Sequence, residues 1–140
     1  MLVKTESLQG LQLDWAVADV LGYECDLNMQ TDPNGEIYVH DVLLKATMKP
    51  YHPTTDWSDG GFIIKRFNIS LLYTEENIPW CAFINLPHKT VTLNKTKGVY
   101  ANTPLMAAML LLIQSQYPDE INIPAEFNKN VSGLPLFKSN

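Results

Sequence analysis

The chain has few of the residues with which proteins build cross-links, metal sites and reactive centres. Cys25 and Cys81 are its only cysteines, they lie far apart, and no CxxC pair occurs. The three histidines lack the HxxxH or Cys/His spacing of a metal site. A Walker loop, a Rossmann fingerprint and a GxSxG elbow are missing as well. We therefore expect free thiols in a reducing cytoplasm, no metal, no cofactor and a non-enzymatic protein.

Basic residues and long apolar runs are also scarce. The formal net charge is -5, and all of the acidic surplus falls within residues 1–70. Such a chain lacks the basic surface of a duplex nucleic-acid binder. The longest apolar run, residues 105–113, is well short of a membrane span, and the first residues lack a signal-peptide layout. The sequence thus predicts a cytoplasmic protein with neither duplex nucleic acid nor membrane as its partner.

Length and composition indicate one soluble globular domain. The chain has 140 residues, of which 46% are hydrophobic and 18% charged. We expect the domain to cover residues 1–127 and residues 128–140 to form a loosely ordered tail.

The first half of the chain alternates short strand-like and helical patterns. Residues 2–5 favour an edge strand, and a helix is predicted over 8–21, with Ser7 as its N-cap and Gly22 just beyond its end. Apolar residues cover most of the circumference of this helix, so we expect it to be largely buried, although Asp14 falls on its apolar flank. Further strands are predicted over 36–48, 68–73, 80–85 and 90–93, and the turn at 74–77 indicates that the strands over 68–73 and 80–85 form a hairpin.

A second helix has the clearest start signal in the chain. Thr103 is a good N-cap and Pro104 suits the first helical position, so a helix is predicted from residue 105 to about 116, before Pro118. The 62–67 segment fits a short helix or a strand equally well. Together the elements predict an α+β fold, a small antiparallel sheet of about four strands packed against two main helices.

Residues 51–61, YHPTTDWSDGG, combine turn formers, aromatics, a carboxylate and two glycines. In a functional interpretation, Tyr51 and Trp57 sandwich a planar ring, nearby polar side chains bind its edges, and the glycines let backbone N–H groups approach an anion. In a structural interpretation, Asp56 caps the next segment and Trp57 closes the edge of the core. His52 beside Asp56 suits an acid–base pair or a simple hydrogen-bonding role.

Two other features extend the candidate site. Asp14 on a buried helix needs a partner, and Arg66, the only arginine, would provide a bidentate one; lysines or backbone N–H groups are the alternatives. The helix start at Thr103 is either a simple cap or an anion site. The candidate ligand-binding residues are Tyr51, His52, Thr54, Thr55, Asp56, Trp57, Gly60, Gly61, Arg66, Thr103 and Pro104, with Asp14 and Trp15, a core or stacking residue, in support.

Five motifs occur in a recognisable order: residues 3–5 (VKT), 13–18 (LDWAVA), 51–61 with Ile63 and Ile64, 103–109 (TPLMAAM) and 119–126 (DEINIPAE). They resemble the phage NinX family, small proteins of lambdoid and related phages once classed only as a domain of unknown function. The resemblance spans roughly residues 1–127 and implies a phage or prophage origin and a location in the host cytoplasm, without implying a reaction. Phe62 and Lys65 depart from the proline and the acid usual in the family.

Two functions from different classes follow. The first is non-enzymatic binding of a small, nucleotide-like ligand, which in a phage accessory protein would sequester a host defence signal. The alternative is a protein–protein interaction module that inhibits or redirects a host or phage protein. A ligand binder should have a pocket lined by residues 51–61 and 103–105, whereas an adaptor should carry Tyr51 and Trp57 on a flat apolar patch. The oligomeric state is left open, a homo-oligomer included.

Overall fold

The computed structural model describes residues 1–28, 36–40, 48–84 and 98–125. The strand predicted over 90–93 and the tail at 128–140 lie outside these residues, as does part of the 36–48 prediction. The described elements, in chain order, are β1 (Leu2–Lys4), a 3₁₀ turn η1 (Thr5–Ser7), α1 (Gly10–Val20), β2 (Glu24–Asn28), β3 (Glu36–His40), β4 (Met48–Pro50), α2 (Trp57–Arg66), β5 (Ile69–Tyr73), β6 (Trp80–Ile84), β7 (Val99–Ala101), α3 (Pro104–Gln116) and β8 (Glu120–Asn122).

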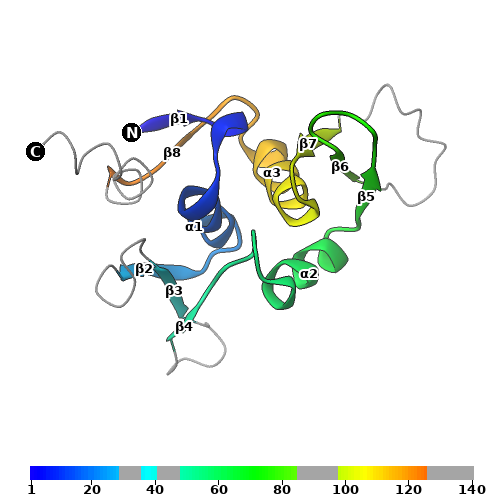
Figure 1. Ribbon diagram of the computed structural model, residues 1–140. Helices are drawn as coiled ribbons and strands as arrows, with labels where there is room; N and C mark the ends of the chain where they lie inside the picture. Colours follow the sequence, from blue (N-terminus) through cyan, green and yellow to red (C-terminus); the bar gives the residue numbers. More distant parts are fainter. Residues whose placement is uncertain (29–35, 41–47, 85–97, 126–140) are drawn as a thin grey trace, which may run out of the picture.

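The α+β class is confirmed, with the strands divided among three small antiparallel sheets. Their orders are β1-β8, β2-β3-β4 and β5-β6-β7. Figure 1 shows the three sheets around the outside of the three helices. The strands are three to five residues long, and helices separate one sheet from the next along the chain. Each sheet therefore packs its apolar side chains against helices instead of extending into a neighbouring sheet.

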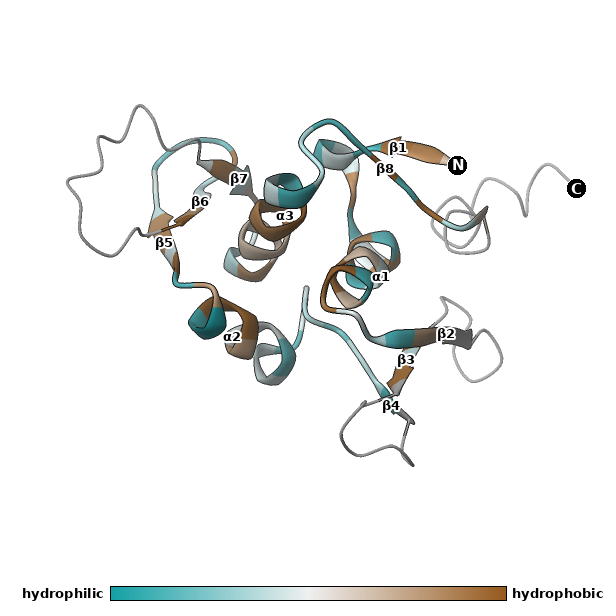
Figure 2. Cartoon of the chain, turned by 180° about the vertical axis from the view of Figure 1, so that it is seen from behind, coloured by the Kyte–Doolittle hydropathy of each residue, from teal (hydrophilic) through white to brown (hydrophobic). Residues whose placement is uncertain are grey.

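Helix α3 is the centre of the core. Its residues from Ala107 to Ile113 are all buried, and it packs against α1, α2 and the β5-β6-β7 sheet. This run of consecutive buried apolar residues spans almost two helical turns and so faces every direction, which is the pattern of a helix surrounded by protein; Figure 2 shows brown bands along α3. The predicted start is confirmed: the Thr103 hydroxyl accepts a 3.2 Å hydrogen bond from the Met106 N–H, and Pro104 is the first helical residue.

Helix α1 ends as predicted but begins later. Gly22 has φ +83°, and the Tyr23 N–H donates to the Ala18 carbonyl at 2.9 Å, which is the bond pattern of a glycine-terminated helix. Ser7 is not the N-cap, because its hydroxyl donates to the Lys4 carbonyl within the η1 turn. The helix starts at Gly10 instead.

A tertiary contact explains the delayed start of α1. Thr5 is fully buried; its hydroxyl donates to the Tyr117 carbonyl at 2.8 Å, and its N–H donates to the Asp119 carbonyl at 2.9 Å. These bonds tie the start of the chain to the end of α3. The η1 turn therefore holds Thr5 against the end of α3, and helix α1 begins after this turn.

The hairpin predicted in the middle of the chain is confirmed. Strands β5 and β6 pair from Ile69 opposite Ile84 to Tyr73 opposite Trp80. The ambiguous 62–67 segment is helical up to Arg66, the last residue of α2, and β7 was not predicted. Among the described residues, no helix has the length and apolar character needed to cross a membrane.

Candidate functional site

The 51–61 segment is a short turn followed by a capped helix. The N–H groups of Thr55 and Asp56 both donate to the His52 carbonyl, at 3.1 and 2.8 Å. The Asp56 side chain then accepts a 2.8 Å hydrogen bond from the Ser58 N–H and caps α2. The structural interpretation of Asp56 is therefore confirmed, while Thr55 is exposed on the turn.

The two aromatic residues of this segment lie in different environments. Tyr51 is 3% exposed and packs edge-to-face against Tyr23, with ring centroids 5.5 Å apart. Trp57 is 55% exposed at the first position of α2. It neither closes the core nor faces Tyr51 across a pocket, because Trp57 is exposed to solvent whereas Tyr51 is buried.

Asp14 anchors the turn to α1. This residue is 4% exposed, and its carboxylate accepts a 3.0 Å hydrogen bond from the Thr54 N–H and lies 3.8 Å from Nδ1 of His52. Burial raises the pKa of this carboxyl above its ordinary value, and the nearby His52 imidazole and the hydrogen bond from Thr54 limit the rise. The buried carboxylate thus holds the turn by a backbone N–H, one of the alternatives drawn from the sequence.

The predicted Asp14–Arg66 pair is wrong. Arg66 is exposed in the last turn of α2, where its guanidinium lies 5.2 Å from the centre of the Phe67 ring. The Asp14 contacts come from the turn before the start of α2, and nine residues of helix carry Arg66 about 13 Å further along the axis. Trp15 is half-buried and packs against the core.

The two adjacent glycines have unrelated roles. A Cβ on Gly60 would lie 2.5 Å from both the Pro53 carbonyl oxygen and Cδ2 of Leu105, so α2 needs glycine here to pack against the turn and α3. The Gly60 N–H donates to the Asp56 carbonyl at 2.8 Å and is already used by the helix. A Cβ on Gly61 would meet only Cε3 of Trp57, at an ordinary 3.9 Å. The close approach made by Gly60 is therefore to protein, not to an anion.

The two segments proposed to converge do meet, through Gly60 of α2 and Leu105 in the first turn of α3. The meeting point is packed with side chains. Thr103 caps α3. Neither Thr103 nor Pro104 lines the pocket described next. The contact therefore supports the core rather than a shared ligand site.

A pocket lies instead between the β2-β3-β4 sheet and the start of α2. Its volume is about 300 Å³, and it is lined by Tyr23, Val39, Lys49, Tyr51, Ser58, Asp59 and Phe62. Of the predicted site residues, Tyr51 is the one that lines it. The remaining lining residues were missed because they come from segments far apart in sequence. Assigning 62–67 to a helix would have placed Ser58 and Phe62 on one helix face.

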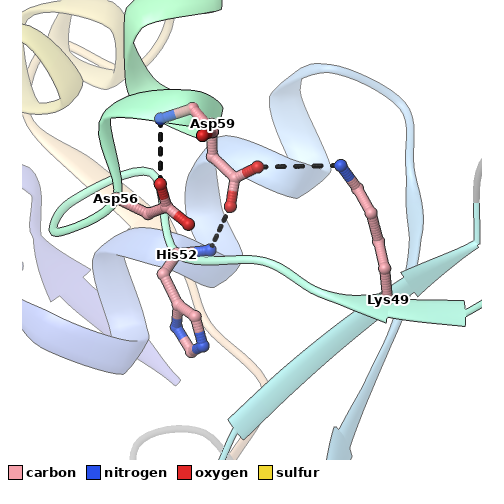
Figure 3. A network of polar contacts seen from close by, with 5 residues as sticks. Lys49, His52, Asp56 and Asp59 are labelled. Atoms are coloured by element: carbon pink, nitrogen blue, oxygen red, sulfur yellow. Dashed lines mark hydrogen bonds and ion pairs between the residues drawn. The ribbon is translucent and has the colours of Figure 1, made fainter.

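Asp59 joins the two walls of this pocket (Figure 3). One carboxylate oxygen lies 3.6 Å from Nζ of Lys49 on β4, and the other accepts a 2.9 Å hydrogen bond from the His52 N–H. The lining thus has one cation paired with one carboxylate. Burial raises the pKa of the Tyr51 hydroxyl above its usual range, and neighbouring Tyr23, Asp59 and Asp14 add to the rise, so this hydroxyl stays protonated at neutral pH.

Residues 4–116 match the family model described as Bacteriophage P22, NinX. Because the match covers more than half of the chain, the chain belongs to this family, and the resemblance seen in its motifs is confirmed. It is a phage accessory protein. No curated protein gives a significant match. All residues that line the pocket fall within the matched region.

Proposed function

We propose that this member of the phage P22 NinX family binds a small, ring-bearing, nucleotide-like molecule in the pocket beside Asp59. The observation that carries the proposal is the lining, in which the aromatic rings of Tyr51 and Phe62 lie beside the polar groups of Ser58, Asp59 and Lys49. A volume of about 300 Å³ is at the lower end of the range for small-molecule sites. It suits one planar ring system.

The charges around the pocket favour a particular division of contacts. One oxygen of Asp59 faces Lys49 and would accept a hydrogen bond from an N–H of the bound ring, while the Ser58 hydroxyl both donates and accepts. The N–H groups of Ser58 and Gly60 already donate to Asp56. A phosphate would therefore be held by Lys49, whose side chain is 57% exposed, with the ring inside.

In a phage accessory protein, binding without chemistry suggests sequestration. We infer that the protein acts in the host cytoplasm, where it would remove a nucleotide-like defence signal from its receptor. Among the described residues no group of three or more His, Cys, Asp or Glu side chains is placed to hold a metal ion, so the proposal involves the side chains of the pocket alone.

The test is a thermal-shift screen against nucleosides, nucleotides and cyclic nucleotides, with two matched variants. Phe62 lines the pocket and Trp57 does not, yet both are aromatic residues of α2 with exposures of 56% and 55%. A ligand at a hundredfold excess over Kd stabilises the native state by about 2.7 kcal/mol. We expect a Tm rise in the wild type and in Trp57→Ala, and its loss in Phe62→Ala. A screen in which no compound raises the wild-type Tm would contradict the proposal.

A second candidate is a protein–protein interaction module, and the exposure of Trp57 is the observation that favours it. Its ring lies over Gly61, outside the pocket, where burial by a partner would be favourable. In that case Trp57→Ala would weaken binding to a host or phage protein at least as much as Phe62→Ala. The same two variants thus separate the two functions.

A further inference from the structure

His52 lies between two carboxylates that belong to different helices. Nδ1 of its imidazole is 3.8 Å from Oδ2 of Asp14 on α1, and its backbone N–H donates at 2.9 Å to Oδ2 of Asp59 on α2. Figure 3 shows the imidazole pointing away from Asp59. The side chain of His52 therefore faces Asp14, while its backbone N–H faces Asp59. One residue therefore connects a buried carboxylate to the pocket.

The turn that carries His52 is held too firmly to move independently of its neighbours. Asp14 also accepts from the Thr54 N–H, Pro53 between them has a fixed φ, and the Pro53 carbonyl lies against Gly60. Pro53 and Thr54 are buried. A change in the attraction between Asp14 and the imidazole therefore acts on the whole turn, including the N–H that holds Asp59.

We propose that Asp14 and His52 are positioning residues of the pocket, and that protonation of the His52 imidazole is transmitted through its backbone to Asp59 and the Asp59–Lys49 pair. A protonated imidazole is attracted to the Asp14 carboxylate, whereas a neutral one makes at most a hydrogen bond. The inference goes beyond the proposed function, because it concerns the walls of the pocket whether or not a ligand binds there.

The groups that face His52 set the pH range. Among the residues that the structure describes, these groups include Asp14 from α1 and Asp59 from α2, with Lys49 from β4 paired to Asp59 and the Tyr51 hydroxyl near both carboxylates. Burial raises the pKa of Asp14, so its carboxylate is ionised only above that raised value. Histidine is the side chain that ordinarily titrates between about pH 5 and 8. The charged pair therefore exists only while the imidazole is protonated and Asp14 is ionised, and it is lost when the imidazole deprotonates.

The experiment is an NMR titration of the full chain without ligand, between about pH 5 and 8. It follows the His52 ring and the backbone amides of Asp59 and Phe62. In the wild type, we expect the pocket amides to shift with the same midpoint as the ring. In Asp14→Asn, which keeps an acceptor for the Thr54 N–H, the ring midpoint should move to lower pH. The control is Asp19→Asn, which removes an exposed carboxylate of the same helix and should leave the midpoint of the His52 ring unchanged.

Two outcomes would overturn the inference. One is that the Asp59 and Phe62 amides do not follow the ring of His52, and the other is that Asp14→Asn and Asp19→Asn leave the same midpoint. His52→Gln serves as a second variant: it removes the titrating group, and the pocket amides should then lose their transition while the amide spectrum of α3 keeps its folded pattern. Because no ligand is present, failure here is distinct from a flat ligand screen.

Discussion

Helices α2 and α3 both begin with a capping side chain, yet their first turns have opposite surroundings. Asp56 caps α2 and Thr103 caps α3, each through a hydrogen bond to a backbone N–H. The start of α3 leads at once into the core, whereas the start of α2 carries an exposed Trp57 and the pocket residue Asp59. A cap signal therefore fixes where a helix begins, and the neighbouring elements decide whether that helix start supports a site.

The largest effect should come from the first turn of α3. Leu105 is 3% exposed, so Leu105→Ala removes buried methyl groups and leaves a cavity, at a cost of about 2–5 kcal/mol in the free energy of unfolding. At the start of α2, the exposed Trp57→Ala should change stability by less than about 0.5 kcal/mol. Urea unfolding of both variants measures the contrast, and similar losses would contradict it.

The adjacent glycines of α2 sharpen the comparison. Gly60→Ala places a Cβ against the Pro53 carbonyl, so we expect a loss of about 1–3 kcal/mol. Gly61→Ala meets no close atom and should stabilise the helix by up to about 1 kcal/mol, since alanine has the higher helix propensity. Thermal unfolding of the pair checks the prediction, which is wrong if the two shifts have the same sign.

Removing each cap tests how similar the two helix starts are in energy. Asp56→Ala and Thr103→Ala should each cost about 1 kcal/mol, because each leaves one backbone N–H without its side-chain acceptor. We expect Asp56→Ala, besides its loss of stability, to shift the NMR signal of the Asp59 amide. Thr103→Ala should lose similar stability and leave that signal unchanged. Chemical denaturation and amide spectra provide the two measurements.

The smallest effect should be a pH dependence that belongs to Asp14. Because burial raises its pKa above 3.8, the folded protein holds this proton more tightly than the unfolded chain does. Protonated Asp14 therefore stabilises the folded protein below pH 3.8, and this stabilisation is lost as the pH rises through the raised pKa. The stability of the wild type relative to Asp14→Asn should fall across this range. Parallel pH series of urea unfolding measure it, and a rising difference would show that the sign is wrong.

Local signals in the chain predicted the elements well where one residue fixes the backbone. Thr103 with Pro104 gave the start of α3, and Gly22 gave the end of α1. Two strand-like runs separated by the turn at 74–77 gave the β5–β6 hairpin. Ser7 failed as a cap because Thr5 is bound to the end of α3, and such a contact between distant segments has no signature in the local sequence.

The candidate site was predicted less well, for a related reason. The sequence indicated that residues 51–61 were unusual and that Asp14 needed a partner. The partner turned out to be the turn itself, through Thr54 and His52, and not the distant Arg66. Lys49 is an ordinary residue of a short strand by its sequence, and its ion pair with Asp59 depends on the tertiary fold, which brings this strand residue to the start of α2.

By itself, then, the sequence determined the phage NinX family, the α+β class, the start of α3 and the end of α1, and it showed no obvious catalytic motif. These depend on residue types and on spacings of a few residues, which local backbone preferences convert directly into structure. The tertiary structure decided that Gly60 serves packing, that Asp14 holds a turn, and that the pocket gathers residues from β3, β4 and α2. Those outcomes depend on distances between segments far apart in the chain, and only the packing of helices against sheets fixes these distances.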